Sequence, residues 1–136
     1  MIVRNLQDII GSERDVAAPN GHWISRRFLL KQDGMGFSMH DTTLYAGTET
    51  YMWYKHHVEA VYCVAGRGEL EDLETGQIYP ISNGTLYALN GNERHYLRVF
   101  EEMRMICVFN PPLTGREVHT KEGYYPLDET DEMEED

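Results

Sequence analysis

Residues 47–66 combine a polar turn that carries metal-binding and proton-transferring groups with an apolar run that would hold those groups in place. The turn contains two adjacent histidines, His56 and His57, and is followed by Glu59. Imidazole and carboxylate groups bind metal ions and exchange protons near neutral pH. The apolar run at 58–65 is typical of a β-strand. A strand end that presents such groups rigidly indicates a metal or catalytic site in a small β-barrel.

Short strand signals recur along the whole chain and alternate with turn-forming clusters such as Ser-Asn-Gly at 82–84. Strands at this regular spacing predict an all-β sandwich or closed barrel. One brief helical piece at 6–10 opens the chain. The predicted strands are 27–31, 36–44, 51–54, 58–65, 68–73, 77–81, 85–89, 95–99 and 103–109.

The length of 136 residues fits one domain with a single core. No apolar run approaches the roughly 20 residues of a membrane helix, and the N-terminus lacks the apolar core of a signal peptide. We therefore expect a cytoplasmic protein with no membrane partner. Cys63 and Cys107 stand in apolar runs, which predicts buried free thiols and not a disulfide scaffold.

The formal net charge is −11, and much of it comes from the acidic segment 128–136. Such a segment is typical of a disordered, solvated tail, so we expect a domain at 1–127 followed by this tail. Nucleic acid is not an expected partner, because phosphate binding needs clustered Lys and Arg residues.

The spacing of the first segment can be written as Gly47, five residues, Trp53, one residue, Lys55, three residues, Glu59, six residues, Gly66. This pattern resembles the first motif of the cupins, small β-barrels with the pattern G-x5-H-x-H-x3–4-E-x6-G. Trp53 and Lys55 stand where cupins usually have two metal-binding histidines. The pattern therefore predicts a cupin barrel without the usual cupin metal site.

The second cupin motif, G-x5-P-x-G-x2-H-x3-N, can be placed on this chain in two ways. A start at Gly84 ends on a real histidine, His95, which follows a plausible turn. A start at Gly76 places Tyr87 at the histidine position. The first alignment is better, and the second draws attention to Tyr87.

Segments along residues 1–127 resemble the ectoine synthase family. The most distinctive is Cys-Val-Phe-Asn-Pro-Pro-Leu-Thr-Gly-Arg-Glu-Val-His at 107–119. The others are Met-Ile-Val-Arg-Asn-Leu at 1–6, Asp-Gly-Met-Gly-Phe-Ser at 33–38, Glu-Ala-Val-Tyr at 59–62, Glu-Asp-Leu-Glu-Thr-Gly at 71–76, Gly-Thr-Leu-Tyr-Ala-Leu at 84–89 and Arg-His at 94–95.

This resemblance implies a cytoplasmic, homodimeric, iron-dependent cupin of jelly-roll-like form. Such an enzyme closes the small molecule N-γ-acetyl-L-2,4-diaminobutyrate into the compatible solute ectoine and releases water. By resemblance, the ligands of Fe2+ are Glu59, Tyr87 and His95. Tyr54, Glu117 and His119 jointly supply the general base and acid. Substrate contacts fall on Trp23, Arg27, His40, Thr42, Cys107 and Phe109.

Taken singly, several of these residues have plainer interpretations. Arg27 alone reads as a surface charge and Tyr87 as a buried aromatic, and His56 and His57 are expected at the surface or behind the site. Two other functions also fit an open metal site or a modified first motif: an oxygen-dependent cupin dioxygenase and a cupin that only binds a solute. After the prolines at 111 and 112, residues 113–127 are expected to run irregularly, with 114–119 as a candidate lid.

Overall fold

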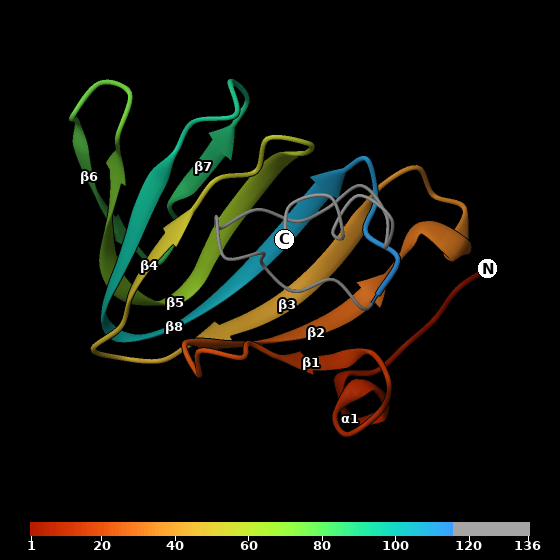
Figure 1. The fold of residues 1–136 in the computed structure, drawn as a ribbon. Coiled ribbons are helices and arrows are strands. Elements are labelled where there is room, and N and C mark those ends of the chain that lie inside the picture. Colours follow the sequence, from red (N-terminus) through yellow and green to blue (C-terminus); the bar gives the residue numbers. More distant parts are fainter. Residues whose placement is uncertain (116–136) are drawn as a thin grey trace.

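Two long strands dominate the structure, a computed structural model in which residues 1–115 are described. They are β5 (Val58–Asp72) and β8 (His95–Asn110). The two strands pair antiparallel over almost their full lengths, from Val58 opposite Asn110 to Asp72 opposite His95. Figure 1 shows them running side by side through the middle of the molecule. Among the described residues, four other strands pair directly with one of these two, and the remaining two extend the sheet outward from one of those four.

The remaining strands extend both halves of this central pair. On one half, β7 (Leu86–Leu89) pairs with the start of β5, and β3 (Ser38–Leu44) pairs with the end of β8. On the other half, β6 (Ile78–Ser82) pairs with the end of β5, and β4 (Glu49–Met52) pairs with the start of β8. The sheet is completed by β2 (Trp23–Leu29) beside β3 and β1 (Asp15–Ala17) beside β2. The predicted all-β barrel is confirmed.

Glycines allow the central pair to bend where its two halves meet. A Cβ at Gly66, whose φ is +101°, would lie 2.6 Å from the Cα of Met103, and a Cβ at Gly68 would overlap the carbonyl oxygen of Arg98. The register between β5 and β8 shifts in this same region. Separate strands at 58–65 and 68–73 were therefore a wrong prediction, because the glycines bend one strand instead of ending it. The separate strands predicted at 95–99 and 103–109 are likewise one strand, β8, which contains no glycine and follows the bend of β5 through their pairing.

The barrel interior is apolar because inward-facing positions alternate along β5 and β8. Cys63 is fully buried, and it and Cys107 are free thiols, as expected. Other buried side chains of this core are Leu44, Met52, Val61, Leu70, Ile81, Leu97, Val99, Met103 and Met105.

Short elements precede the barrel. The predicted helical piece is α1 (Leu6–Ile9), whose N-terminus is capped by the side chain of Asn5 accepting a hydrogen bond from Gln7 N at 2.9 Å. β2 begins four residues earlier than predicted, and a short 3₁₀ helix, η1 (Lys31–Asp33), follows it. Within residues 1–115, none of the helices is both long and apolar enough to span a membrane. The acidic segment 128–136, the domain boundary before it, and most of the candidate lid lie outside the described residues.

Candidate functional site

A cavity of about 40 Å³ lies inside the barrel and is lined by inward-facing side chains of β2, β3, β4, β5, β7 and β8 and of the loop after β4. Its wall combines an apolar part, which includes Leu44, Val61 and Met105, with a polar part. Most of the predicted site residues contribute to it. They are Trp23, His40, Thr42, Tyr54, Glu59, Tyr87, Cys107 and Phe109.

One row of inward-facing positions brings these residues together from five strands. Arg27 on β2 is opposite His40 on β3, and His40 is opposite Cys107 on β8. Cys107 is in turn opposite Val61 on β5, which is opposite Tyr87 on β7. Cross-strand neighbours on one face lie about 5 Å apart, so the sheet register alone assembles this wall. Glu59 lies one inward position before Val61, opposite Phe109.

Glu59 is a buried carboxyl group in the cavity wall. Its residue is 6% exposed, and burial raises its pKa to about 8, while a hydrogen bond with Cys107 acts in the opposite direction. Tyr87 is partly buried beside it, and burial followed by the charge of Glu59 holds the tyrosine pKa well above its usual value. The ionised forms of both groups are unfavourable in this apolar wall, and a cation bound between their oxygens would stabilise those ionised forms.

His95 lines, together with Tyr87, a hollow beside the cavity. It is 1% exposed, and its Nδ1 donates a hydrogen bond to the carbonyl of Glu93 at 3.0 Å. This bond fixes the tautomer and leaves Nε2 as a lone-pair donor, which has no hydrogen-bond partner within residues 1–115. Burial lowers the pKa of His95, so the ring is neutral, the form that ligates metals.

Together, Glu59, Tyr87 and His95 fit a divalent metal ion. Tyr87 connects them, because it lines the cavity with Glu59 and also a neighbouring hollow of about 340 Å³ with His95. Histidine, cysteine and acidic side chains do not form a cluster of three anywhere in residues 1–115, so a three-ligand site here needs the tyrosine. Carboxylate, phenolate and imidazole are a mainly hard donor set that suits ferrous iron.

The usual cupin ligand positions contribute nothing to the cavity wall. Lys55 Nζ lies 5.1 Å from the ring centroid of Trp53, so the two side chains contact each other. Neither residue belongs to the cavity lining.

Tyr54 lies in the loop between β4 and β5 and points inward. It is 3% exposed, its hydroxyl donates to Met52 Sδ at 3.1 Å, and its ring packs edge-on against Phe109 with centroids 5.2 Å apart. Its ring centroid is 5.8 Å from that of His95. The predicted catalytic tyrosine is thus beside the candidate metal ligands. Its predicted partners, Glu117 and His119, lie outside the described residues.

Asn92 holds this loop in place, a role that the sequence reasoning missed. Its side-chain amide donates to the carbonyls of Tyr54, at 2.8 Å, and His57, at 3.0 Å. Its φ of 55° is the left-handed conformation, which asparagine tolerates better than most residues. The second cupin motif usually has glycine at this position, and the presence of asparagine in its place was the sequence feature that could have indicated this role.

A buried polar cluster of Arg27, Ser25 and His40 lies beside the cavity; His40 lines the cavity, whereas Arg27 is not one of its lining residues. Arg27 is fully buried, so its interpretation as a surface charge is wrong. Its Nε donates to Ser25 Oγ at 3.4 Å, and the same hydroxyl hydrogen-bonds His40 Nδ1 at 3.0 Å. Burial, followed by the charge of Arg27, holds the pKa of His40 well below its usual value, so His40 is neutral. Arg27 is therefore a fixed positive charge beside an uncharged imidazole.

His57 supports the site from behind. It is 2% exposed, its Nδ1 donates to the carbonyl of Pro111 at 2.8 Å, and its ring meets the edge of Phe109 with centroids 5.9 Å apart. Of the two locations expected for His57, the surface one is wrong. His56 is partly exposed.

Comparisons with known proteins agree along nearly the whole chain. The ectoine synthase family profile matches residues 1–129. The L-ectoine synthase of Desulfatibacillum aliphaticivorans is 58% identical over 127 residues, which cover 93% of this chain and 98% of that protein. That of Desulfosudis oleivorans is 60% identical over 128 residues, with the same coverage.

Solved structures give the same result. The crystal structure of ectoine synthase from P. lautus has a TM-score of 0.84 and 56% identity, covering 93% of this chain and 91% of that one. A predicted oxalate decarboxylase from Thermotoga maritima has a TM-score of 0.66 at 16% identity, covering 81% of this chain and 99% of the other. The second likeness shows the shared cupin fold alone.

Proposed function

The chain belongs to the ectoine synthase family, and from this premise we propose how its cavity carries out the family reaction. The protein is an ectoine synthase, a lyase that converts N-γ-acetyl-L-2,4-diaminobutyrate into ectoine with release of water. The observation that carries this function is identity above 50% to L-ectoine synthases over 93% of the chain.

The reaction makes demands that the site has to meet. The α-amine of the substrate attacks the carbonyl carbon of its own acetamide group, a C–N bond forms, and the carbonyl oxygen leaves as water after gaining two protons. Amides are poor electrophiles, so the carbonyl has to be polarised. The amine has to lose protons and the oxygen has to receive them, which calls for a general base and a general acid.

We infer that Glu59, Tyr87 and His95 would hold a ferrous ion. Support comes from Nε2 of His95, which has no hydrogen-bond partner among residues 1–115, and from the buried, poorly solvated oxygens of the other two residues. Such an ion supplies Lewis acidity toward a carbonyl oxygen and leaves coordination positions open.

The other residues bind and orient the substrate in this proposal. Arg27 supplies the positive charge for the substrate carboxylate, next to the neutral His40. Trp23 and Phe109, at 4% and 2% exposure, exclude water and favour the folded-back conformer that ring closure requires. Tyr54, with Glu117 and His119, moves the protons.

We also propose that the enzyme is a cytoplasmic homodimer that uses Fe2+. The support is the same family membership that assigns the activity. A small-molecule substrate agrees with a cavity in the barrel interior that has a largely apolar wall and a few polar side chains.

The function is tested by incubating the purified, iron-loaded protein with N-γ-acetyl-L-2,4-diaminobutyrate and measuring ectoine by chromatography. We expect ectoine from the wild type. Arg27→Met should raise KM by roughly ten- to a hundredfold, since a charge-assisted hydrogen bond to the carboxylate is lost. The matched control is Arg67→Met, an arginine with a 56% exposed side chain on the outer surface, which should leave KM unchanged. Failure of the iron-loaded wild type to form ectoine would contradict the proposed function.

A further inference from the structure

Strand β2 contains a bulge directly after Arg27. Arg27 is opposite His40 and Leu29 is opposite Met39, so Phe28 is an extra residue in the ladder. The bulge shifts the inward alternation by one residue, and Leu30 becomes the next buried side chain, at 2% exposure. Arg27 is therefore the last inward-facing residue of β2 before the irregularity, and the geometry of the bulge sets the direction of its side chain.

The backbone carbonyls at the bulge lie beyond the end of β1, whose last pair on this side joins Asp15 to Arg26. Guanidinium groups from the N-terminal region take the place of a strand here. Arg4 Nη1 donates to the carbonyl of Phe28 at 2.7 Å. Arg14 Nη1 lies 3.4 Å from the carbonyls of both Arg27 and Phe28. Side chains from residues distant in sequence thus supply hydrogen bonds to the backbone carbonyls of the bulge.

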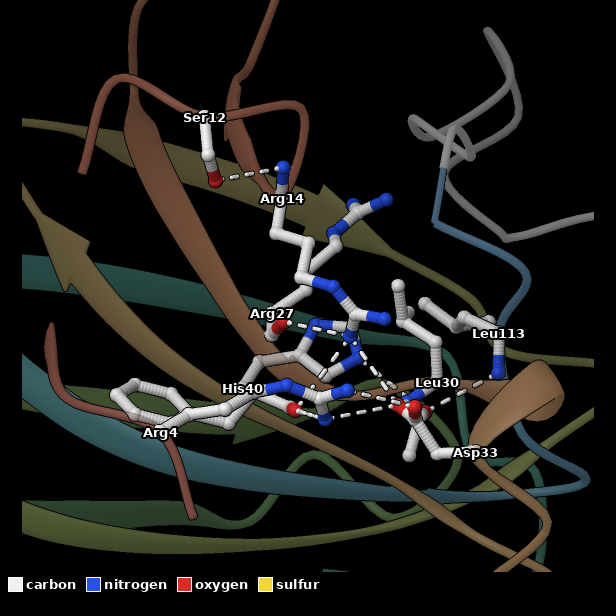
Figure 2. Close-up of polar contacts among 10 residues, drawn as sticks. Arg4, Ser12, Arg14, Arg27, Leu30, Asp33, His40 and Leu113 are labelled. Atoms are coloured by element: carbon white, nitrogen blue, oxygen red, sulfur yellow. Dashed lines mark hydrogen bonds and ion pairs between the residues drawn. The ribbon is translucent and has the colours of Figure 1, made fainter. Parts of the chain in front are cut away.

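Asp33 holds both guanidinium groups in position. Its carboxylate accepts bonds from Arg4 at 2.8 and 3.1 Å, from Arg14 at 3.1 Å and from the backbone N–H of Leu30 at 2.9 Å. Figure 2 shows the two arginines converging on this carboxylate beside Arg27 and His40. We call Arg4, Arg14 and Asp33 the bulge clamp.

The bulge clamp differs from the surface ion pairs of the molecule. The side chain of Asp33 is only 8% exposed, whereas Arg94 and Glu74 form an outer pair with side chains 47% and 42% exposed. Bonds from Arg4, with further ones from Leu30 and Arg14, hold the pKa of Asp33 well below its usual value. A carboxylate that is ionised and bonded on both oxygens fixes its partners far better than an exposed pair does.

We propose that the bulge clamp positions Arg27 for the substrate carboxylate, with Asp33 as its central positioning residue. The inference deepens the proposed function and rests on the role of Arg27 given there. Asp33 does not touch the substrate; it acts through the carbonyls of the bulge. Loss of its charge frees both guanidinium groups, relaxes the bulge and lets the Arg27 side chain leave its binding orientation.

A second route from Asp33 to the site has to be separated from this one. The corner after the bulge also holds Leu113, whose carbonyl accepts from Lys31 N at 2.8 Å and whose N–H donates to Ser38 Oγ at 3.1 Å. A change at Asp33 could therefore reach the cavity through Leu113 and not through Arg27. A double-mutant cycle with Arg27 distinguishes the two routes.

The experiment measures KM and kcat for N-γ-acetyl-L-2,4-diaminobutyrate in the iron-loaded wild type, Asp33→Asn, Arg27→Met and the double variant. Asp33→Asn should raise KM about tenfold and change kcat by less than about twofold, since a misdirected charge-assisted bond mainly weakens binding. In the Arg27→Met background, Asp33→Asn should raise KM no further. Iron content should equal that of the wild type in all four proteins.

Two further variants guard against a folding defect. Arg4→Met disrupts the bulge clamp at its more exposed arginine and should raise KM as Asp33→Asn does. Arg4→Lys keeps the positive charge, so its KM should lie between those of Arg4→Met and the wild type. The matched control is Asp15→Asn. It removes the 3.0 Å ion pair between Asp15 and Arg26 of β2, the strand that carries the bulge, but it removes no contact to the bulge carbonyls. Its KM should equal that of the wild type.

Different results would contradict the clamp inference, the role of Arg27 and the proposed function. Independent multiplication of the KM effects of Asp33→Asn and Arg27→Met, or an unchanged KM in both Asp33→Asn and Arg4→Met, would overturn the clamp inference alone. An unchanged KM in Arg27→Met would overturn the role of Arg27 and the inference with it. No ectoine from the wild type would overturn the proposed function as well.

Discussion

Glu59 gives the most informative prediction, because its burial ties the stability of the iron-free protein to pH. The perturbation is Glu59→Gln, which keeps the shape and removes the ionisation. The pKa of Glu59 is raised from 4.5 to about 8 in the fold, mainly by burial. A carboxyl group whose pKa is raised favours the folded state while it is protonated, so its contribution is complete below pH 4.5 and is lost as the pH rises toward 8.

The size of the effect follows from that shift. Each pKa unit corresponds to about 1.4 kcal/mol, so the full shift gives an upper limit on the order of 5 kcal/mol. Between pH 5 and pH 8, the free energy of unfolding of the iron-free wild type should fall by roughly 3 to 4 kcal/mol relative to Glu59→Gln. The wild type loses this stability because Glu59 ionises above about pH 4.5 in the unfolded chain, whereas the fold keeps it protonated up to about pH 8.

The assay is urea unfolding of both chelator-treated proteins at pH 5, 6, 7 and 8, at one protein concentration and ionic strength. The difference between the two free energies cancels the groups that both proteins share. Ferrous iron should reverse the trend in the wild type only, since it binds the ionised carboxylate. Two curves that stay parallel within about 0.5 kcal/mol from pH 5 to pH 8 would refute the reasoning, because Glu59 would then titrate as it does in the unfolded chain.

Three further predictions follow from single contacts. Tyr87→Phe should fold as the wild type does but lose about ten- to a hundredfold in iron affinity, as read by a competition assay with a chelator, because a ligand oxygen is removed; wild-type affinity would exclude the tyrosine as a ligand. Asn92→Ala should lower kcat/KM about tenfold by releasing the loop that carries Tyr54, with Asn92→Asp no better, and unchanged kinetics would contradict the role given to the amide. Gly68→Ala should lower the free energy of unfolding by about 3 kcal/mol or more because its Cβ would overlap the Arg98 carbonyl, whereas Gly91→Ala, which meets only the movable Glu93 side chain, should cost less than about 1 kcal/mol; equal losses in the two variants would argue against the close approach of β5 and β8.

Most of the fold is predictable from local sequence patterns. Alternation and turn residues located nearly all strands, because each strand buries one face and each turn needs Gly, Asn or Asp at particular positions. The pattern failed at Gly66 and Gly68. Glycine marks both a turn and a bend, and only the pairing of β5 with β8, a contact distant in sequence, distinguishes the two. The short β1 has too few residues for a periodic signal.

Most of the predicted site residues lie together in the fold, whereas the residues that support them could not be predicted from the sequence. Family resemblance named Glu59, Tyr87 and His95, and the sheet register and shared cavity bring most of the predicted residues together. The burial of Arg27 could not be read from β2 alone, since an arginine in a strand is usually exposed. The roles of Asp33 and Arg4 also could not be predicted from the sequence, because the two residues meet only when the N-terminal segment folds against the bulge of β2.

The central claim is that a metal ion held by Glu59, Tyr87 and His95 is required for ring closure. The most direct test measures bound iron and the rate of ectoine formation on the same samples of wild type and Glu59→Ala. We expect about one iron per chain and turnover in the wild type, and loss of both in Glu59→Ala, with near-native circular dichroism. Retention of either full iron binding or full turnover by Glu59→Ala would contradict this claim.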